Sequence, residues 1–477
     1  MTTECTQTSF EFQRLGRRQV TAGFNGGTIT TEGGALLLRE VEQQTGIVRQ
    51  FTDCFIDHRS PVLIEHELSE LVGQRVYGLA LGYEDLNDHD ELRRDPMMAL
   101  LVGKEDLTGE GRRRREDKGK PLAGKSTLNR LELTRPDADR KTRYKKIVAN
   151  GEAVDRLFVE LFLQAHPQPP RRIVIDLGST DDPLHGKQEG RFFHGYYGSY
   201  CYLPLYIFCG EFLLCARLRP SNIDASKGAV DELERIVGRI RQAWPEVEIE
   251  IRADSGFARE EIMRWCEDHQ VDYVLGLAKN ARLTRAIGGE LQQARQEYER
   301  TGQPARIFRD LSYRTQKTWS RTRRVVAKAE HIEGKANPRF VVTSLPVEQM
   351  EARALYEKEY CARGDMENRI KEQQLYLFAD RTSTATMRAN QLRLWFSSVA
   401  YCLLQALRRL GLQGTELARA QCHTIREKML KIGAQVRITV RRIWVAMASG
   451  CPYAEVFEQV YRRLSHPRDP EGAEAAV

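Results

Sequence analysis

The feature that most constrains the fold is the order of strand-like and helical segments between residues 173 and 300. Runs of β-branched and apolar residues predict strands, and apolar spacings of three and four predict helices. The predicted strands cover 173–177, 202–209, 211–218, 247–254 and 271–277, and the predicted helices cover 228–243, 260–269 and 281–300. Three strands therefore come first, and helices and strands alternate after them. This order indicates a layered α/β domain with a central sheet.

A three-strand meander followed by βα units is the order of a ribonuclease-H-like core. Residues 305–345 add further strand-like pieces, which predict a β-strand insertion. Helical spacing resumes near Ala354 and continues, with breaks, to about Leu464. We therefore predict an α/β protein with a ribonuclease-H-like core, a β-strand insertion, a mostly helical N-terminal domain and a helical C-terminal region.

Changes in pattern along the chain suggest boundaries between these parts. A proline-marked joint, residues 166–172, separates the helical amino-terminal region from the first strand. The expected parts are a mostly helical region (1–165), the first part of the core (168–304), a β-rich insertion (305–345), the second part of the core (346–410), a basic helical region (411–465) and a disordered tail (466–477).

The composition excludes several classes of protein. Hydrophobic residues make up 41% of the 477 residues, enough to bury cores for two or three domains. No apolar run reaches the roughly 18–20 residues that a membrane span needs. The amino terminus lacks the basic start and apolar stretch of a signal peptide. The ten cysteines are scattered, without a Cys-x-x-Cys spacing, so we expect a reducing, cytoplasmic location and no membrane partner.

Acidic residues stand where the predicted sheet brings them together. Asp176 lies on the first strand and Asp254 ends the fourth, and these two strands are neighbours in a ribonuclease-H-like order. The loop after the first strand adds Asp181 and Asp182. Taken alone, Asp254 also suits a turn or a helix cap, and the loop acids also suit a solvated surface.

A third carboxylate comes from a predicted helix far along the chain. Tyr360, Arg363, Glu367 and Lys371 follow one another at spacings of three and four, so they share one helix face. A solvated helix on which Glu367 pairs with Arg363 and Lys371 has the same spacing. Together with the two strand acids, Glu367 completes a set of three carboxylates.

Three carboxylates at one edge of a sheet indicate a site for two divalent ions that promotes phosphoryl transfer. An all-oxygen site suits Mg²⁺, with Mn²⁺ as the alternative. The predicted catalytic metal ligands are Asp176, Asp254 and Glu367, and the predicted supporting residues are Tyr360, Arg363 and Lys371.

Two basic clusters indicate contact with a polyanion such as DNA. Residues 111–120 carry six bases and two acids, and residues 421–442 carry six bases and one acid. A solvated loop and an ordinary charged helix face are the competing interpretations. The predicted DNA contacts are Arg112, Arg113, Arg114, Arg115, Arg426, Lys428 and Lys431.

A sequence with the spacing of a nucleotide-binding motif begins at the end of the first basic cluster. Residues 119–126, GKPLAGKS, fit the spacing of a phosphate-binding loop. That loop needs a buried strand immediately before it, whereas residues 111–118 here are GRRRREDK. We therefore expect no nucleotide partner.

Longer segments carry a specific resemblance. They are YGLALGYEDLNDHD from Tyr77, LAGKSTLNRLE from Leu122, TDDPLHGKQEG from Thr180, DSGF from Asp254, YCARGDMENR from Tyr360 and LRLWFSS from Leu392. With these segments the chain resembles bacterial insertion-sequence transposases with a DDE active site, specifically insertion-sequence family 1380, from about residue 18 to 460. The resemblance implies a ribonuclease-H-like core with a β insertion before the last acid.

The resemblance also implies roles for individual residues. The second acid of the family falls on Asp254 and the third on Glu367, within a Tyr-(two)-Arg-(three)-Glu-(six)-Lys signature. The last position of that signature is Gln374 in this chain. Lys371, one turn earlier on the same helix stripe, is the candidate substitute.

The chain departs from the family pattern at the first acid. The family strand resembles Asp-x-Asp-x-Thr, whereas this chain has Asp176 in the first slot and Gly178 in the second. Either Asp176 serves as the ligand, or this copy has lost its first carboxylate and is impaired. Residues two apart on a strand share a face but lie about 6–7 Å apart, which matters for Mg²⁺ because it holds its ligands at about 2.0–2.1 Å.

The function implied is cleavage of double-stranded DNA at the terminal inverted repeats of an insertion sequence, followed by joining of the 3′-hydroxyl ends to target DNA. Two divalent ions are the expected cofactors. Because two ends must be brought together, we expect at least a homodimer on DNA, in the bacterial cytoplasm and associated with the nucleoid. The alternative is an impaired copy that only binds inverted-repeat DNA.

Overall fold

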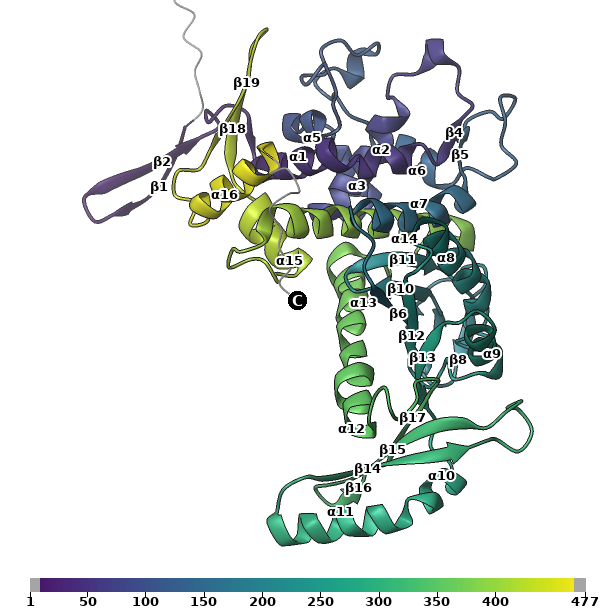
Figure 1. The fold of residues 1–477 in the computed structure, drawn as a ribbon. Coiled ribbons are helices and arrows are strands. Elements are labelled where there is room, and N and C mark those ends of the chain that lie inside the picture. The colour runs from purple at the N-terminus through teal and green to yellow at the C-terminus, as the bar shows by residue number, and fades with distance from the viewer. Residues whose placement is uncertain (1–8, 467–477) are drawn as a thin grey trace, which may run out of the picture. The chain divides into compact units, whose positions relative to one another are not determined.

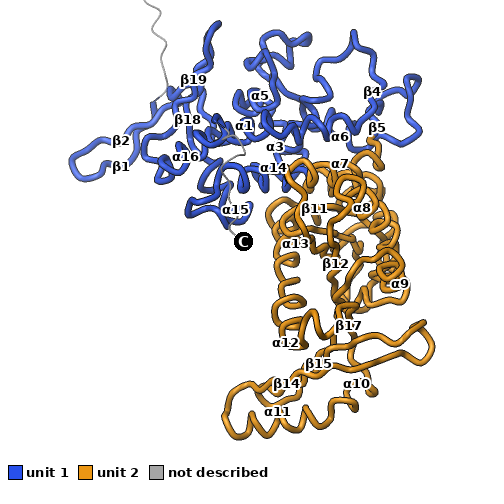
Figure 2. The backbone as a smooth tube through the Cα atoms, viewed as in Figure 1, with its two compact units in different colours: residues 1–148, 399–477 blue, residues 149–398 orange. Residues whose placement is uncertain are grey.

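The computed structural model describes residues 9–466. The chain forms two compact units, one of residues 149–398 and one of residues 1–148 together with 399–477 (Figure 2). Helix α14 (Met387–Leu407) contains the boundary between them. Within residues 9–466, no helix has both the length and the apolar character that a membrane crossing requires.

The unit of residues 149–398 is built on a nine-stranded mixed sheet, in which eight strands have the order β11-β10-β6-β12-β13-β17-β15-β14 and β16 pairs with β15 off this path (Figure 1). The first predicted strand, β6 (Arg172–Ser179), pairs in parallel with the fourth, β12 (Glu248–Ala253), so their expected adjacency is confirmed. The other predicted strands of this part are β10 (Leu205–Cys209), β11 (Phe212–Arg217) and β13 (Asp272–Leu277). β10 and β11 run antiparallel to their neighbours, and β13 runs parallel to β12.

Alternation along β6 gives this strand one apolar face and one face that carries Asp176 and Gly178. Ile173, Ile175 and Leu177 are buried in a large apolar cluster, and because neighbouring residues of a strand point to opposite faces, Asp176 and Gly178 face the other way. The helices that supply the apolar cluster are α7 (Gly151–Gln164), α8 (Ala229–Ala243) and α9 (Glu260–Asp268).

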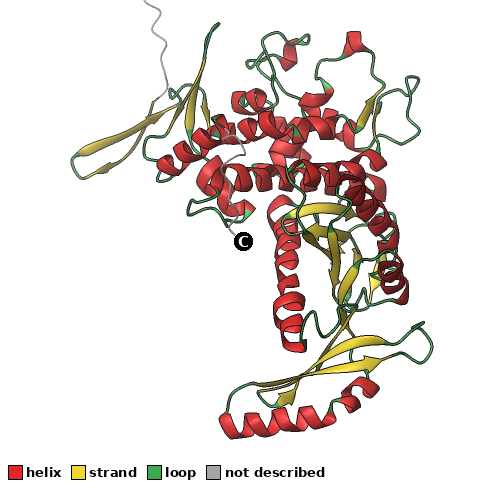
Figure 3. Ribbon diagram, viewed as in Figure 1, coloured by secondary structure: helices red, strands yellow, loops and turns green. Residues whose placement is uncertain are grey.

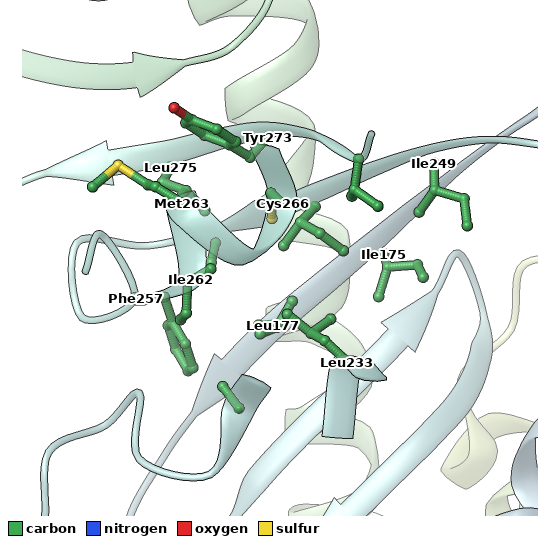
Figure 4. Packing of buried hydrophobic residues seen from close by; sticks show 14 of the residues in the cluster. Ile175, Leu177, Leu233, Ile249, Phe257, Ile262, Met263, Cys266, Tyr273 and Leu275 are labelled. Atoms are coloured by element: carbon green, nitrogen blue, oxygen red, sulfur yellow. The ribbon is translucent and has the colours of Figure 1, made fainter. Parts of the chain in front are cut away.

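Figure 4 shows how the apolar face is filled. Leu233 of α8 and Ile262 of α9 lie near Ile175 and Leu177 of β6. Full burial of such a side chain stabilises the fold by about 1.5–3 kcal/mol. The apolar faces of the predicted helices therefore cover one side of β6 and β12. Other elements cover the side that carries Asp176 and Arg252.

The strands of the predicted β insertion extend the same sheet. β17 (Arg339–Thr343) pairs antiparallel with β13, and β15 (Arg323–Ile332) and β14 (Ala305–Tyr313) follow outward, with β16 (Lys335–Ala336) beside β15. The free edge of β13 needs main-chain partners, and β17 supplies them. Two helices connect β13 to β14, namely α10 (Ala281–Ala286) and α11 (Gly288–Thr301).

The opposite face of the sheet is covered by the segment that carries the predicted third acid. This segment packs on Asp176 and Arg252 of β6 and β12 and on a second apolar cluster from β13, β15 and β17. It consists of α12 (Ala352–Ala354), the π-helical η5 (Leu355–Tyr360), η6 (Cys361–Arg363) and α13 (Gly364–Leu377). α13 contacts β6 directly. A small sheet of order β7-β9-β8 follows β6 in the chain and consists of β7 (Asp182–Pro183), β8 (Phe192–His194) and β9 (Ser199–Tyr202).

In the other unit, elements from both ends of the chain pack together. Helix α1 (Leu36–Thr45) contacts α16 (Ala454–Ser465), and β3 (Ile29–Thr30) pairs with β18 (Ala434–Ile438). The helices are α1 (Leu36–Thr45), α2 (Ile47–Thr52), α3 (Leu68–Ala80), α4 (His89–Leu92), α5 (Pro96–Leu101), α6 (Lys125–Glu132), α15 (Cys422–Ile425) and α16 (Ala454–Ser465). Shorter helical turns are η1 (Gly33–Ala35), η2 (Pro61–Leu63), η3 (Leu86–Asp88), η4 (Arg115–Asp117), η7 (Arg408–Leu412) and η8 (Arg426–Leu430).

Two regions predicted to be helical contain strand pairs, drawn in yellow in Figure 3. The remaining strands are β1 (Ser9–Leu15), β2 (Arg18–Gly23), β3 (Ile29–Thr30), β4 (Phe55–Asp57), β5 (Ile147–Ala149), β18 (Ala434–Ile438) and β19 (Ile443–Met447). The predicted helical region 411–465 is interrupted by β18 and β19, because β-branched residues recur at every second position there, which favours a strand. The expected disordered tail lies, from residue 467 onward, outside the described residues.

A buried ion-pair cluster joins β15 to α9. Arg323 Nε lies 2.6 Å from Glu267 Oε1 and Nη1 lies 2.7 Å from Glu260 Oε2, with the Arg323 side chain 2% exposed. Loss of Arg323 removes its charged hydrogen bonds to the partly buried carboxylates of Glu260 and Glu267, so we expect Arg323→Ala to lower the free energy of unfolding by about 1.5–3 kcal/mol.

The matched control is Arg321, which also reaches Glu267, at 3.2 Å, but is 57% exposed. Exposed pairs contribute little, so we expect Arg321→Ala to cost less than about 1 kcal/mol. Chemical denaturation of both variants measures the difference. Equal losses for the two arginines would contradict the structural role given to Arg323.

Candidate functional site

Asp176, the predicted first acid, is held in a buried ion pair on the face of β6 opposite its apolar residues. The parallel register places Asp176 level with Arg252 of β12. Arg252 donates from Nε to Asp176 Oδ1 at 2.6 Å and from Nη2 to Oδ2 at 2.8 Å. Burial raises the pKa of Asp176, and the Arg252 guanidinium opposes that rise. Both carboxylate oxygens therefore serve the ion pair.

This ion pair belongs to a larger buried network that attaches η5 to the sheet. Arg252 Nη1 donates to the main-chain oxygen of Glu359 at 2.7 Å. The Glu359 carboxylate lies 3.2 Å from Arg172, which also lies 2.7 Å from Glu250. Burial, together with the neighbouring Glu359 charge, raises the pKa of Glu250 to about 8. The network thus positions the segment that leads into α13.

The position of Gly178 is filled by α13. A Cβ at Gly178 would overlap Met366 Cε and would lie 3.2 Å from Ile370 Cδ1. Met366 and Ile370 are both buried. The slot in which the family pattern has an acid therefore receives an apolar contact, and a side chain there requires Met366 to move.

Asp254 lies at the end of β12 beside the Tyr360 hydroxyl. Its Oδ1 accepts a hydrogen bond from the Gly256 amide at 2.7 Å, and the residue is half-buried. A Cβ at Gly276 would lie 2.5 Å from Tyr360 Oη and 3.2 Å from the Asp254 carbonyl carbon, so the hydroxyl reaches this strand end. Burial raises the pKa of Tyr360, Arg363 lowers it, and the Asp254 charge adds to the rise.

Glu367 is exposed on α13 and forms an ion pair with Arg363, one turn earlier. The Arg363 charge also opposes the rise that burial causes in the pKa values of Asp176 and Tyr360. Among the predicted site residues, Arg363 therefore interacts with Glu367, Asp176 and Tyr360. Lys371 is exposed further along the same helix.

Gln374, at the last position of the signature, ties α13 to the loop after β6. Its Nε2 donates to the Asp181 main-chain oxygen at 3.1 Å and to Asp182 Oδ1 at 3.0 Å. Asp182 is fully buried, and burial raises its pKa to about 8. Asp181 is half-buried, and its charge acts on Tyr197 together with that of Asp254. Burial raises the pKa of Tyr197, and Asp181 and Asp254 are both close enough to it to add to that rise.

The model of the family described as "Transposase DDE domain group 1" matches residues 12–469. The chain belongs to this family. A search of curated proteins found no match. The chain is also similar to a solved structure, described as the "piggyBac transposase synaptic complex with hairpin DNA", at 9% identity and a TM-score of 0.40, over 93% of this chain and 84% of that chain.

DDE transposase domains generally use divalent metal ions, and the residues of this chain do not fit the two-ion site that the sequence predicts. Among residues 9–466, no three His, Cys, Asp or Glu side chains are grouped so that they could hold a metal ion. The cause lies at the first acid, because Arg252 binds both oxygens of Asp176 and position 178 offers no carboxylate.

The basic residues predicted to contact DNA fall into two groups. Arg426 is buried and donates to the main-chain oxygens of Leu79 and Ala80, and Lys431 lies 2.6 Å from Glu32. Arg112 lies 3.4 Å from Glu65 and 3.7 Å from Asp117, with a side chain only 10% exposed. In contrast, Arg113, Arg114 and Arg115 are exposed, and Lys428 lies over the Tyr453 ring.

Arg252 and Glu359 are the residues of this site that sequence reasoning missed. Arg252 lies in the segment Arg252-Ala-Asp-Ser-Gly that holds the second acid. When β6 and β12 are aligned in parallel so that their apolar residues match, Arg252 lies level with Asp176. The pairing of these two residues was therefore predictable from the sequence. Glu359 lies in a π-helix, whose changed spacing removes it from the face expected for a regular helix.

The Asp176–Arg252 pair predicts a non-additive pattern of stability. Arg252→Leu leaves the Asp176 carboxylate buried and without its cation, so we expect a loss of about 3–5 kcal/mol in the free energy of unfolding. The double variant Asp176→Leu/Arg252→Leu removes both charges and is expected to recover most of that loss. Urea denaturation measures both, and a double variant no more stable than the single one would refute the pairing.

Asp182 predicts a pH dependence of stability. Its pKa is raised from 3.8 to about 8 in the folded state, so the unfolded chain releases this proton more readily. The stability contribution of the neutral acid is complete below about pH 4 and is lost as the pH rises towards 8, by up to about 1.4 kcal/mol per pH unit. Asp182→Asn mimics the neutral acid, since Gln374 can still donate to its amide oxygen.

We therefore expect the melting temperature of Asp182→Asn to exceed that of the unaltered chain at pH 8–9, with the gap narrowing towards pH 5. Thermal unfolding across this range measures the gap. The control is Asp181→Asn, because Asp181 is half-buried and only its main-chain oxygen accepts from Gln374. A pH-independent difference for Asp182→Asn would contradict the assignment.

Proposed function

We propose that this chain is a DNA transposase that acts at the terminal inverted repeats of an insertion sequence. The family match over residues 12–469 is the observation that carries this proposal. In the reaction proposed, a water oxygen attacks a phosphorus at the element end and the 3′ oxygen leaves. The freed 3′-hydroxyl then attacks a phosphodiester of target DNA, whose own 3′ oxygen leaves.

We further propose insertion-sequence family 1380 as the group and a ribonuclease-H-like core as the catalytic part. The sequence segments from Tyr77, Leu122, Thr180, Asp254, Tyr360 and Leu392 support the group. The antiparallel pair β10–β11 beside the parallel strands β6, β12 and β13 supports the core.

The proposed catalytic residues are Asp254 and Glu367, with Asp176 as the sequence-based first acid. Asp254 lies at a strand end beside Tyr360, and Glu367 is exposed on α13. Arg363 pairs with Glu367 and holds it near the sheet. Lys371 is exposed one turn further along α13, where its ammonium is free to contact a DNA phosphate.

A second candidate function is favoured by the geometry of the first acid. In it, this copy binds inverted-repeat DNA but is impaired in cleavage. The bidentate contact of Arg252 with Asp176 supports it, as does the Met366 side chain beside Gly178. A two-ion reaction requires a first carboxylate that is free to bind metal.

The proposed partners are double-stranded DNA, both inverted repeats and target, and a second copy of the chain. Two element ends must be held together during joining, so a homodimer or larger assembly on DNA is proposed, in the cytoplasm and at the nucleoid. The exposed arginines at 113–115 support contact with phosphates, which positions DNA without reading its sequence.

The deciding experiment measures cleavage of a duplex that carries the element's own inverted repeat, in Mg²⁺ and in Mn²⁺. The variants are Gly178→Asp, Gly178→Asp/Met366→Ala and Glu367→Gln. Because a missing ligand removes a large part of such a rate, we expect Gly178→Asp/Met366→Ala to cut at least about 100-fold faster than the unaltered chain. Gly178→Asp alone should gain less, since its side chain displaces Met366.

Adding Glu367→Gln to the restored variant should abolish its cleavage. If instead the unaltered chain cuts and Glu367→Gln does not, the impaired copy is excluded and the transposase is active as it stands. If the chain and all variants neither bind nor cut the repeat, the transposase proposal itself is overturned.

A further inference from the structure

A stretch of the chain near the carboxyl terminus carries positive charge only. Between Glu427 and Glu455 there is no acidic residue. The bases in this stretch are Lys428, Lys431, Arg437, Arg441 and Arg442. The structure separates them, because Lys431 pairs with Glu32 and Lys428 lies over Tyr453, whereas the three arginines occupy the outer half of the β18–β19 ribbon.

The base of this ribbon is fixed within its own unit. β18 pairs with β3 through Ala434 opposite Thr30, and the Val436 amide donates to the Thr28 main-chain oxygen at 2.8 Å. Val436 is 4% exposed. The base of the ribbon is therefore attached to β3 within this unit.

The outer half has no further strand beside it among residues 9–466. It consists of the pairs Arg437 opposite Trp444 and Ile438 opposite Ile443. The turn after Ile438 is closed by the Thr439 amide, which donates to the Arg442 main-chain oxygen at 2.9 Å, and by the Arg442 amide, which donates to Thr439 Oγ1 at 3.0 Å. Hydrogen bonds thus hold the tip in a defined shape.

The tip exposes apolar and basic groups together. Val440 is completely exposed, and Trp444 and Ile443 are 61% and 43% exposed. Among the described residues, no carboxylate pairs with Arg441 or Arg442. Exposed apolar groups at the end of a ribbon indicate a contact surface, and arginines without acidic partners indicate that the contact is with an anion.

We propose that the β18–β19 ribbon is an arm that enters a groove of duplex DNA. The major groove, about 12 Å wide, admits a two-stranded β-ribbon. Arg441 and Arg442 contact phosphates at the groove edges, and Val440 contacts the base edges at the floor of the groove. That the partner is DNA rests on the proposed function. That the β18–β19 ribbon makes the contact rests on the exposed apolar and basic residues at its tip.

A protein partner fits this surface less well. Exposed β-ribbons also bind a second copy of the same chain through their apolar faces. A self-contact would bring Arg441 and Arg442 of two copies together with no acid in the ribbon to balance them. DNA satisfies these charges along both strands of the groove.

The test is the salt dependence of DNA binding by the full chain. Fluorescence anisotropy with an inverted-repeat duplex, and with a random duplex of the same length, gives the slope of log K against log salt between about 50 and 200 mM. For Arg441→Gln/Arg442→Gln we expect the slope to fall by about 2, since each phosphate contact contributes about 0.9. We expect affinity at the lower salt to fall at least about 10-fold.

The matched control is Arg156→Gln/Arg264→Gln. Both arginines are exposed on helices and each lies within 4 Å of an acid four residues away, Glu152 and Asp268 respectively. This control removes the same net charge, so an unchanged slope shows that the effect of the ribbon variant is local. Thermal unfolding of each variant checks that the fold is intact.

A second variant tests the apolar tip. Val440→Ser keeps every arginine, so we expect weaker binding to both duplexes with the slope of the unaltered chain. If Arg441→Gln/Arg442→Gln binds like the unaltered chain, the arm is overturned while the proposed function stands. If the ribbon variants change only the oligomeric mass in solution, the ribbon mediates self-association and the arm is also overturned. Failure of the unaltered chain to bind either duplex would overturn the proposed function as well.

Discussion

The parallel pairing of β6 with β12 is the constraint on which the rest of the 149–398 unit depends. The apolar residues of β6 fill one face, so Asp176 must face the other, level with Arg252. A buried carboxylate is costly without a cation that hydrogen-bonds to it. Arg252 meets that need and also reaches the main chain of Glu359. One residue of the paired strands, Arg252, therefore both neutralises Asp176 and attaches η5 to the sheet.

The same ion pair limits the chemistry of the site. A divalent ion and a guanidinium compete for the same carboxylate oxygens, and here the guanidinium holds both of them. The space beside Gly178 is closed by Met366. The remaining acids, Asp254 and Glu367, have partners of their own in Gly256 and Arg363. The pair that stabilises the sheet therefore also occupies the carboxylate that the sequence predicts as the first metal ligand.

Charge patterns in the other unit show why a count of basic residues is a poor guide to DNA contacts. Arg426 and Lys431 come from the same basic stretch as Arg441. Arg426 is buried and bonds to main-chain oxygens, and Lys431 is neutralised by Glu32. Arg441, at a turn beyond the last neighbouring strand, is exposed. An arginine that is buried against main-chain carbonyls stabilises the fold, and its burial keeps it from a phosphate at the surface.

The sequence by itself determined the chain order of β6, β10, β11, β12 and β13 and the one-turn spacing of Arg363 and Glu367, because these follow from local periodicity, and it predicted the adjacency of β6 and β12 from that chain order. Only the tertiary structure decided the partners: Arg252 for Asp176, Met366 in the space beside Gly178, and Gln374 for the buried Asp182. Periodicity states which face a side chain occupies. Which atoms fill that face depends on segments that are far apart in the chain and meet only on folding, and burial then decides whether a charge is paired within the protein or left for a ligand.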